Sequence, residues 1–255
     1  MEIPKAAKGF LLFVVLLIVL RTFFVGAYNI PSKSMEPTLL QGDFILTNKL
    51  VYKFFHPYRG DIVVFDFPYQ EQFGNHLIDV SFIKRIIGLP GDVIEFHNGF
   101  LTINGKPLKY RLVKETANGK IYEEFIPTRV GLRKHLVLFK RPKVEAERWG
   151  VYAQAIPPGS CLKRSELYPD WCQVIKVPKG YYFVMGDNRD NSYDSRFWGF
   201  LKKDFVQSTP FVIYFSGKVP TLTPKNSTPF SGITQLFHAI FHPRLERIGK
   251  PVIFR

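Results

Sequence analysis

Three short stretches of the sequence hold side chains whose types and spacing allow chemistry. Ser32 and Ser34 lie one residue apart, soon after an apolar N-terminal segment. Lys84 lies inside an apolar run, where burial would lower the pKa of its amine from the usual ~10.4 and leave a neutral base. Residues 186–196 are dense in polar groups directly after an apolar strand. A serine hydroxyl and a neutral lysine are a nucleophile and a base, although Ser-x-Ser beside a proline is by itself typical of a turn.

Other catalytic patterns are missing from the sequence. There is no Gly-x-Ser-x-Gly elbow, no His-Glu-x-x-His helix and no Gly-x-x-x-x-Gly-Lys-Ser/Thr loop. The two cysteines and six histidines form no cluster with zinc-ligand spacing. These absences disfavour a histidine-based hydrolase, a metalloprotease and a P-loop enzyme, and we expect neither a metal nor a cofactor.

The N-terminal segment is apolar enough to meet lipid. Residues 9–28 give 20 residues, with Arg21 as the charged one, which is enough to cross a hydrocarbon core of ~30 Å. Three interpretations compete: an uncleaved anchor, a removed signal peptide and a buried core helix. The bulky pair Phe23-Phe24 before the candidate processing site at 25–27 favours the anchor. Basic residues flank both sides about equally, so charge leaves the orientation open.

The rest of the chain has the composition of a β-rich body. Of the 255 residues of the whole chain, 25 are Phe and 12 are Tyr, with 19 Gly and 19 Pro, which favours strands and turns over long helices. Asn98-Gly99 and Asn104-Gly105 are strong turn signals, and residues 218–232 indicate a loop. We expect no helix of comparable length outside the anchor. Strands are predicted at 44–46, 61–65, 82–87, 93–96, 100–103, 181–185 and 211–215.

The organisation that follows has five parts: a short cytoplasmic tail (1–8), a transmembrane anchor (9–28), a catalytic β core (29–105 and 181–216), an inserted second β-rich module (106–180), and a C-terminal basic extension packed on or near the core (217–255). Most of the formal net charge of +14 lies in 106–150 and 217–255. No nucleic-acid-binding signature accompanies it, so a basic surface facing anionic membrane lipid, or a merely solvated basic face, explains the charge.

The segments around Ser32 and Ser34, around Lys84 and at 186–196 follow one another in this order behind the apolar N-terminal segment. In this they resemble the type I signal peptidase family, the bacterial leader peptidases. The resembling motifs span residues 30–199; the polar box at 186–199 is the most specific, and 106–180 matches no motif. The resemblance implies a mainly β fold of antiparallel sheets with one N-terminal transmembrane helix. It also implies a serine–lysine dyad protease that removes signal peptides from exported preproteins after a small-x-small site, without a cofactor.

The resemblance also assigns roles by motif position. Ser34 corresponds to the nucleophile and Lys84 to its general base. Ser32 corresponds to the hydroxyl of the oxyanion hole, and Ser192 to the serine that orients the lysine amine. The remaining assignments are the supporting charged residues Asp187, Asp194, Arg196 and Arg85, and the substrate-pocket residues Ile30 and Ile83.

The family acts on the outer side of the bacterial cytoplasmic (inner) membrane, which implies a single-pass protein with its catalytic domain on the periplasmic side. In that oxidising compartment Cys161 and Cys172 could pair, and the sequence leaves this open. Signal peptides and anionic lipid are the partners implied, nucleic acid is not, and the oligomeric state stays open. The alternatives are a maturation peptidase dedicated to one exported subunit, such as a pilin, and a catalytically silent membrane-tethered scaffold. A self-cleaving repressor is disfavoured because it would carry a DNA-binding helix pair where this chain has its apolar segment.

Overall fold

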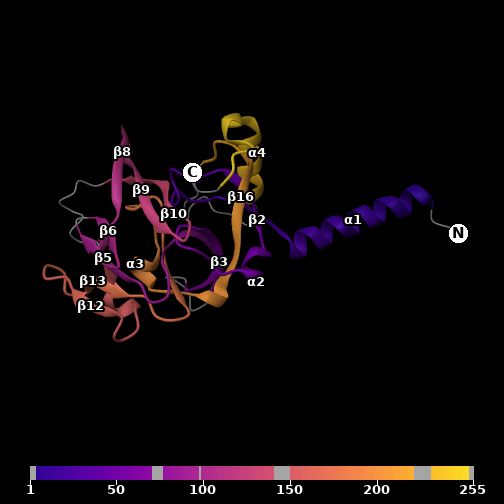
Figure 1. Cartoon of the computed structure of the whole chain (residues 1–255). Coiled ribbons are helices and arrows are strands. Elements are labelled where there is room, and N and C mark those ends of the chain that lie inside the picture. The colour runs from indigo at the N-terminus through magenta and orange to yellow at the C-terminus, as the bar shows by residue number, and fades with distance from the viewer. Residues whose placement is uncertain (1–3, 71–76, 98, 141–149, 221–230, 253–255) are drawn as a thin grey trace.

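A long N-terminal helix projects from a body of β-sheets (Figure 1). The computed structural model describes residues 4–70, 77–97, 99–140, 150–220 and 231–252. Three sheets make up the body, and each ladder between the described strands is antiparallel. The predicted mainly β fold is confirmed.

The largest sheet has seven strands in the order β1–β2–β16–β3–β4–β14–β15. Its long central strand β4 is rich in β-branched and aromatic residues, which suit a buried pleated surface. It pairs with β3 on one side and β14 on the other. The strands are β1 (Val25–Asn29), β2 (Asp43–Asn48), β3 (Ile62–Gln70), β4 (Leu77–Gly88), β14 (Tyr181–Met185), β15 (Leu201–Lys202) and β16 (Val206–Ser216).

The other two sheets use the middle of the chain. A six-stranded sheet contains β5 (Val93–His97), β6 (Phe100–Ile103), β7 (Lys106–Pro107), β11 (Val151–Tyr152), β12 (Cys161–Arg164) and β13 (Trp171–Lys176). A three-stranded sheet contains β8 (Lys109–Thr116), β9 (Gly119–Thr128) and β10 (Gly131–Phe139). A disulfide between Cys161 and Cys172 joins β12 to β13, with 5.6 Å between the two Cα atoms.

Two predicted turns have different outcomes. Asn104 and Gly105 both have positive φ, +52° and +72°, as a two-residue hairpin turn requires, so the turn between β6 and β7 is confirmed. β5 and β6 also pair as a hairpin, with His97 opposite Phe100. Asn98 itself lies outside the described residues.

The module boundary predicted between residues 105 and 106 does not separate two sheets. β5, assigned to the catalytic core, pairs with β13 from the predicted inserted module. Ile94 and Ile175 lie opposite each other in that ladder and are fully buried in one apolar cluster. The six-stranded sheet is therefore shared between the two predicted parts, because its core can be completed only by strands from both.

The helices are α1 (Lys5–Phe23), α2 (Val51–Phe54), α3 (Ser195–Trp198) and α4 (Ser231–Phe241), with 3-10 turns η2 (Ala153–Ala155), η3 (Lys203–Phe205) and η4 (Leu245–Arg247). The predicted anchor bound at Tyr28 is wrong, because residues 25–29 pair with β2 as strand β1. The predicted loop over 218–232 is wrong at its end, where α4 begins. α4 has 11 residues against the 19 of α1, so no described helix outside the anchor is of comparable length. Residues 221–230 lie outside the described residues.

The exposure of α1 excludes one of the three interpretations of the N-terminal segment. Ala7–Phe24 has the length and a mean hydropathy, 2.2, that a membrane-crossing helix needs, and none of it is buried inside the protein. A core helix would be covered by the body, so the core-helix interpretation is wrong. Of the predicted tail, residues 5–8 belong to α1, and residues 1–3 lie outside the described residues.

Candidate active site

Ser34 and Lys84, 50 residues apart in the chain, meet within hydrogen-bond distance. Ser34 lies in the loop between β1 and β2, and Lys84 lies in β4. The lysine Nζ donates to Ser34 Oγ at 2.9 Å and to the carbonyl of Ile83 at 2.9 Å. Both side chains are buried, whereas Ser32 is exposed, with its Oγ 3.2 Å from Ser34 Oγ. The structure therefore brings three of the predicted residues to one point near the surface.

Apolar contacts hold the loop that carries Ser34. Met35 and Leu39 are fully buried, in the same cluster as Ile30, and Ile83 packs against this cluster. Ile30 itself is 3% exposed and Ile83 is partly buried, and their predicted role in a substrate pocket stays a prediction. Ser34 lies between the buried Ile30 and Met35 in the sequence, and their packing fixes it beside β4.

Asn188 fixes the backbone of the same loop from the other side. Its N–H donates to the carbonyl of Ser34 at 3.0 Å, and its side-chain Nδ2 donates to the carbonyl of Lys33 at 3.0 Å. Gly186 lies against the same carbonyl: a Cβ there would collide with Ser34 O and with the side chain of Ser192. Only glycine allows the polar box to approach the serine loop this closely.

Lys84 is buried beside Ser34. Burial lowers the pKa of its amine to about 8, because the charged form loses its hydration. The negative charges of Asp194 and Asp187 oppose that shift, and Arg196 adds to it. No carboxylate among the described residues forms an ion pair with Lys84, and the nearest aromatic contact is the Phe82 ring, 5.5 Å from Nζ. A lysine in this setting can lose its proton near neutral pH.

The predicted supporting charges form two buried ion pairs. Asp187 accepts from Arg85 Nε at 2.8 Å and Nη2 at 2.6 Å, and also from the hydroxyl of Thr38 at 2.5 Å. Asp194 accepts from Arg196 Nε and Nη2, both at 2.8 Å, and from the N–H of Gly186 at 2.9 Å. Although burial alone would raise the pKa of each carboxyl, the adjacent guanidinium lowers it, so both acids stay ionised.

Ser192 lies in the site without the contact expected of it. Its Oγ is buried, and its distances and angles form no hydrogen bond with any group that the structure describes. The predicted hydrogen bond to Lys84 is therefore not formed here. The role of Ser192 in orienting the amine stays a prediction.

Several residues that contact the site were not singled out in the sequence. Thr38 and Asn188 lie inside the recognised segments, so their position was a usable signal. Glu124 and His135 lie on β9 and β10, where no motif is visible. Folding brings them close to the polar box, where His135 lies 3.9 Å from Asp187. Arg189 completes this second cluster of buried charges.

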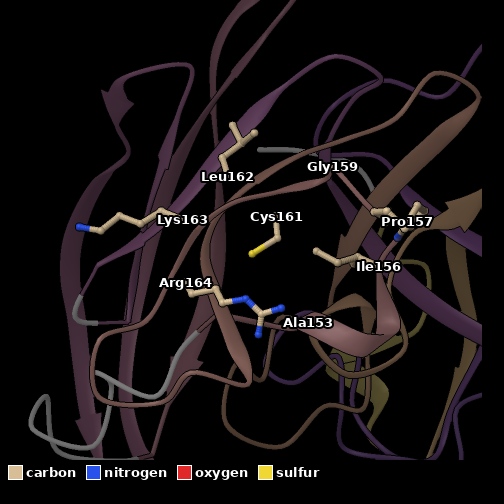
Figure 2. A pocket seen from close by; sticks show the side chains of 9 residues that line it. Ala153, Ile156, Pro157, Gly159, Cys161, Leu162, Lys163 and Arg164 are labelled. Carbon is tan, nitrogen blue, oxygen red and sulfur yellow. The ribbon is translucent and has the colours of Figure 1, made fainter.

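Among the described residues, no group of three or more His, Cys, Asp or Glu side chains could hold a metal ion. A cavity of about 410 Å³ lies between η2 and β12, lined by Ala153 and by residues between 156 and 164 (Figure 2). It contains none of the predicted catalytic residues.

Comparisons with known proteins identify the family of this chain. Residues 3–215 match the family model described as "Signal peptidase, peptidase S26". The chain is 42% identical to signal peptidase I of Aquifex aeolicus (strain VF5) over 262 residues, covering 95% of this chain and 96% of that protein. It is 33% identical to signal peptidase I of Pseudomonas fluorescens over 239 residues, covering 85% of this chain and 74% of that protein.

Among solved structures, a signal peptidase I from Enterococcus faecalis V583 is 26% identical, covering 61% of this chain and 97% of that chain, with a TM-score of 0.32. The family match extends over most of the sequence and includes every residue of the Ser34–Lys84 site. The chain belongs to the signal peptidase family, peptidase S26, and is a serine protease.

Proposed function

We propose that this protein removes N-terminal signal peptides from exported preproteins after a small-x-small site, with Ser34 as nucleophile and Lys84 as general base. The observation that carries the proposal is the 2.9 Å contact between Lys84 Nζ and Ser34 Oγ, in a site where the pKa of the amine is lowered to about 8. With that pKa, roughly one lysine in ten is neutral at pH 7, against about one in several thousand at the ordinary value. Burial therefore increases the supply of base by a few hundredfold.

The reaction runs in two halves. Ser34 Oγ attacks the carbonyl carbon of the scissile peptide while Lys84 Nζ takes the hydroxyl proton. The C–N bond then breaks, the proton passes from Lys84 to the leaving amine, and an ester joins the signal peptide to Ser34. Water attacks this ester, Lys84 takes the proton from water, and that proton returns to Ser34 Oγ as the acid product leaves.

Ser32 stabilises the negative charge that develops on the carbonyl oxygen. Its hydroxyl is exposed and only 3.2 Å from Ser34 Oγ, so it lies beside the position where a substrate carbonyl must sit for attack. The N–H of Ser34 supplies the second donor of the oxyanion hole. Donors fixed before the reaction stabilise the transition state more than the substrate, because the charge exists only there.

The N-terminal helix places this chemistry at a membrane. We propose that α1 is an uncleaved single-pass anchor in the bacterial cytoplasmic membrane, with the body on the periplasmic side. Lys49 Nζ donates to the carbonyls of Arg21 and Thr22 at 3.4 and 3.3 Å, which ties the end of the helix to the body. The short helix α2 lies near the body end of α1 (Figure 1). In that region Phe54 and Phe55 are 76% and 59% exposed, and with the basic charge of the chain they support contact with anionic lipid.

The test is cleavage of a model preprotein with an Ala-x-Ala site by the detergent-solubilised full chain, with the product resolved by mass. Wild type should cut after the second alanine, and Ser34→Ala and Lys84→Ala should leave the substrate intact. Folded wild type that cuts only one exported subunit, such as a pilin precursor, would replace general processing by a dedicated maturation role. Folded wild type that cuts nothing would favour the silent scaffold.

A further inference from the structure

Two strands outside the predicted catalytic core bring buried ionisable groups to the back of the polar box. Glu124 on β9 is fully buried and His135 on β10 is 7% exposed. They face Arg189, which is 1% exposed and belongs to the box that also carries Asp187. None of the three groups touches Ser34 or Lys84 directly, and the proposed reaction does not use them.

Glu124 is paired with the charged or polar groups of three neighbouring residues. Arg189 donates from Nη1 to Glu124 Oε1 at 2.6 Å and from Nη2 to Oε2, so the pair is bidentate. The hydroxyl of Tyr110 on β8 donates to Glu124 Oε1 at 2.6 Å. His135 Nε2 lies 3.0 Å from Glu124 Oε2 and 3.9 Å from Asp187 Oδ1. Positive and negative groups thus alternate from Glu124 through Arg189 and Asp187 to Arg85, the residue next to Lys84.

The backbone is connected at the same place. The N–H of Leu138 on β10 donates to the carbonyl of Asp187 at 2.8 Å, and the N–H of Arg189 donates to the carbonyl of Leu138 at 2.9 Å. Residues 187–189 therefore run beside β10 as a short parallel bridge. Asn188, in the middle, is the residue that donates to the carbonyl of Ser34. A shift of this bridge would move the nucleophile loop as well.

We propose that Glu124 and His135 are positioning residues for the Ser34–Lys84 dyad: through Arg189 and the bridge to β10 they fix residues 187–189, so that Asp187 faces Arg85 and Asn188 holds the serine loop. This inference rests on the proposed function. It gives the part of the chain without family motifs, residues 106–180, a role in catalysis by the core.

The electrostatics support the same assignment. The guanidinium of Arg189 and the imidazole of His135 keep the pKa of Glu124 far below its usual value against the effect of burial. Burial and the charge of Arg85 lower the pKa of His135, so the imidazole is neutral at pH 7. Glu124 with Arg189 and Asp187 with Arg85 then carry no net charge, and the field at Lys84 depends on this balance. A displacement of about 1 Å near a reacting pair costs on the order of 10²-fold in rate.

The test uses two single variants that disturb the balance in opposite directions. Glu124→Gln leaves the positive Arg189 uncompensated near Asp187, which should lower the pKa of Lys84 and move the acid limb of kcat/KM to lower pH. Arg189→Met leaves the negative Glu124 uncompensated, which should move the limb to higher pH. We expect shifts of roughly half a pH unit, a kcat reduced roughly 10- to 100-fold, a KM within about twofold of wild type, and partial recovery in the double variant.

Lys84 is faced by Ser34, the Ile83 carbonyl, Asp194, Asp187 and Arg196. Neither variant replaces any of these groups, so opposite shifts of the limb report the changed charge of the cluster. His135 would take up a proton beside an unpaired Glu124, so the profiles are measured above pH 7.

A matched control lies one residue away. Glu123 on β9 pairs with the exposed Arg111 and with Lys134 on the outer face of the same sheet, so Glu123→Gln should leave kcat and the pH profile unchanged. If Glu124→Gln does not fold, Tyr110→Phe removes one hydrogen bond to the same carboxylate and keeps every charge, and a several-fold loss of kcat at unchanged KM is expected.

Two results would overturn the proposal: wild-type kcat and an unshifted limb in folded Glu124→Gln, or shifts of the same sign in both single variants. Direct titration of the isotopically labelled Lys84 amine by NMR gives its pKa without turnover. An inactive wild type would therefore count against the proposed function, while the Lys84 titration in the variants would still decide the positioning role.

Discussion

Lys84 and Glu124 are both buried ionisable groups, but the surroundings of Glu124 stabilise its charged form and those of Lys84 destabilise it. Glu124 is enclosed by the guanidinium of Arg189, the hydroxyl of Tyr110 and the imidazole of His135, and it stays charged. Lys84 has a hydroxyl, a carbonyl and an aromatic ring around it, and its pKa is lowered to about 8. Burial without an adjacent counter-charge lowers the pKa of Lys84 and makes its amine available as a base. Burial beside the guanidinium of Arg189 keeps Glu124 ionised.

The contrast holds between neighbours in one strand. Lys84 and Arg85 are consecutive in β4, so their side chains leave the strand on opposite faces. Arg85 meets Asp187 in a bidentate pair, and no such carboxylate meets Lys84 among the described residues. The same strand thus carries a structural cation and a candidate catalytic amine, and the predictions that follow separate the two.

The largest expected effect comes from removing either member of the dyad. Ser34→Ala has no nucleophile, and Lys84→Met has no base to take the serine proton, so cleavage of the model preprotein should fall by at least about 10⁴-fold. Single-turnover assays with excess folded enzyme measure this loss. Appreciable cleavage by Lys84→Met would mean that another group deprotonates Ser34.

Ser32→Ala should have an intermediate effect. Losing one donor of the oxyanion hole costs roughly 10²–10³-fold in kcat, while KM stays close to that of wild type because the donor acts mainly in the transition state. Steady-state kinetics with the same preprotein separates the two parameters. A loss that falls on KM instead would assign Ser32 to substrate binding.

Asp187→Asn breaks the buried ion pair with Arg85, so it should lower the stability of the protein and not only its activity. The change leaves the guanidinium of Arg85 buried with a neutral partner, which costs on the order of 3–5 kcal/mol in the free energy of unfolding. Denaturant unfolding of the variant measures this. A near-neutral result, like that expected when Glu123→Gln removes the ion pair with the exposed Arg111, would show that the Arg85–Asp187 pair does not stabilise the fold.

Lys84→Met should raise the stability of the protein at neutral pH, whereas Asp187→Asn should lower it. The pKa of Lys84 is about 8 in the folded protein and ~10.4 in the unfolded chain, so below pH 8 the folded protein carries the full cost of a buried charge. Between those values the unfolded chain binds the proton that the folded protein lacks, and wild-type stability rises with pH. The variant should be more stable than wild type at pH 6–7, by on the order of 3 kcal/mol, and the gap should close toward pH 10.

Much of the core of this site could be predicted from the sequence because its residues lie in compact motifs. Ser34, Lys84 and the polar box at 186–199 are each recognisable by local pattern, and the β strands follow from apolar runs between turn residues. Glu124 and His135 could not be predicted, since single polar residues in amphipathic strands are indistinguishable from surface positions until the strands are paired. The helix α4 was missed because the surrounding Pro, Thr and Ser residues indicated a loop, and the N-terminal helix was extended too far because residues 25–28 are as apolar as the helix itself.

The pairing between β5 and β13 also depends on information absent from any one segment. Nothing in the local pattern of residues 93–97 selects a partner 80 residues later, and only the shared apolar cluster around Ile94 and Ile175 does so. The predicted module boundaries therefore separate the segments that carry catalytic motifs from the rest, but they cut through the six-stranded sheet.

The central claim, that an unpaired buried lysine activates Ser34, is tested most directly by the pH dependence of kcat/KM for cleavage of the model preprotein by the full chain. The account predicts a rate that rises with pH along a single acid limb with an apparent pKa of about 8, because only neutral Lys84 can take the serine proton. A limb near 6.5, typical of a histidine base, or a rate independent of pH between 6 and 9, would contradict it.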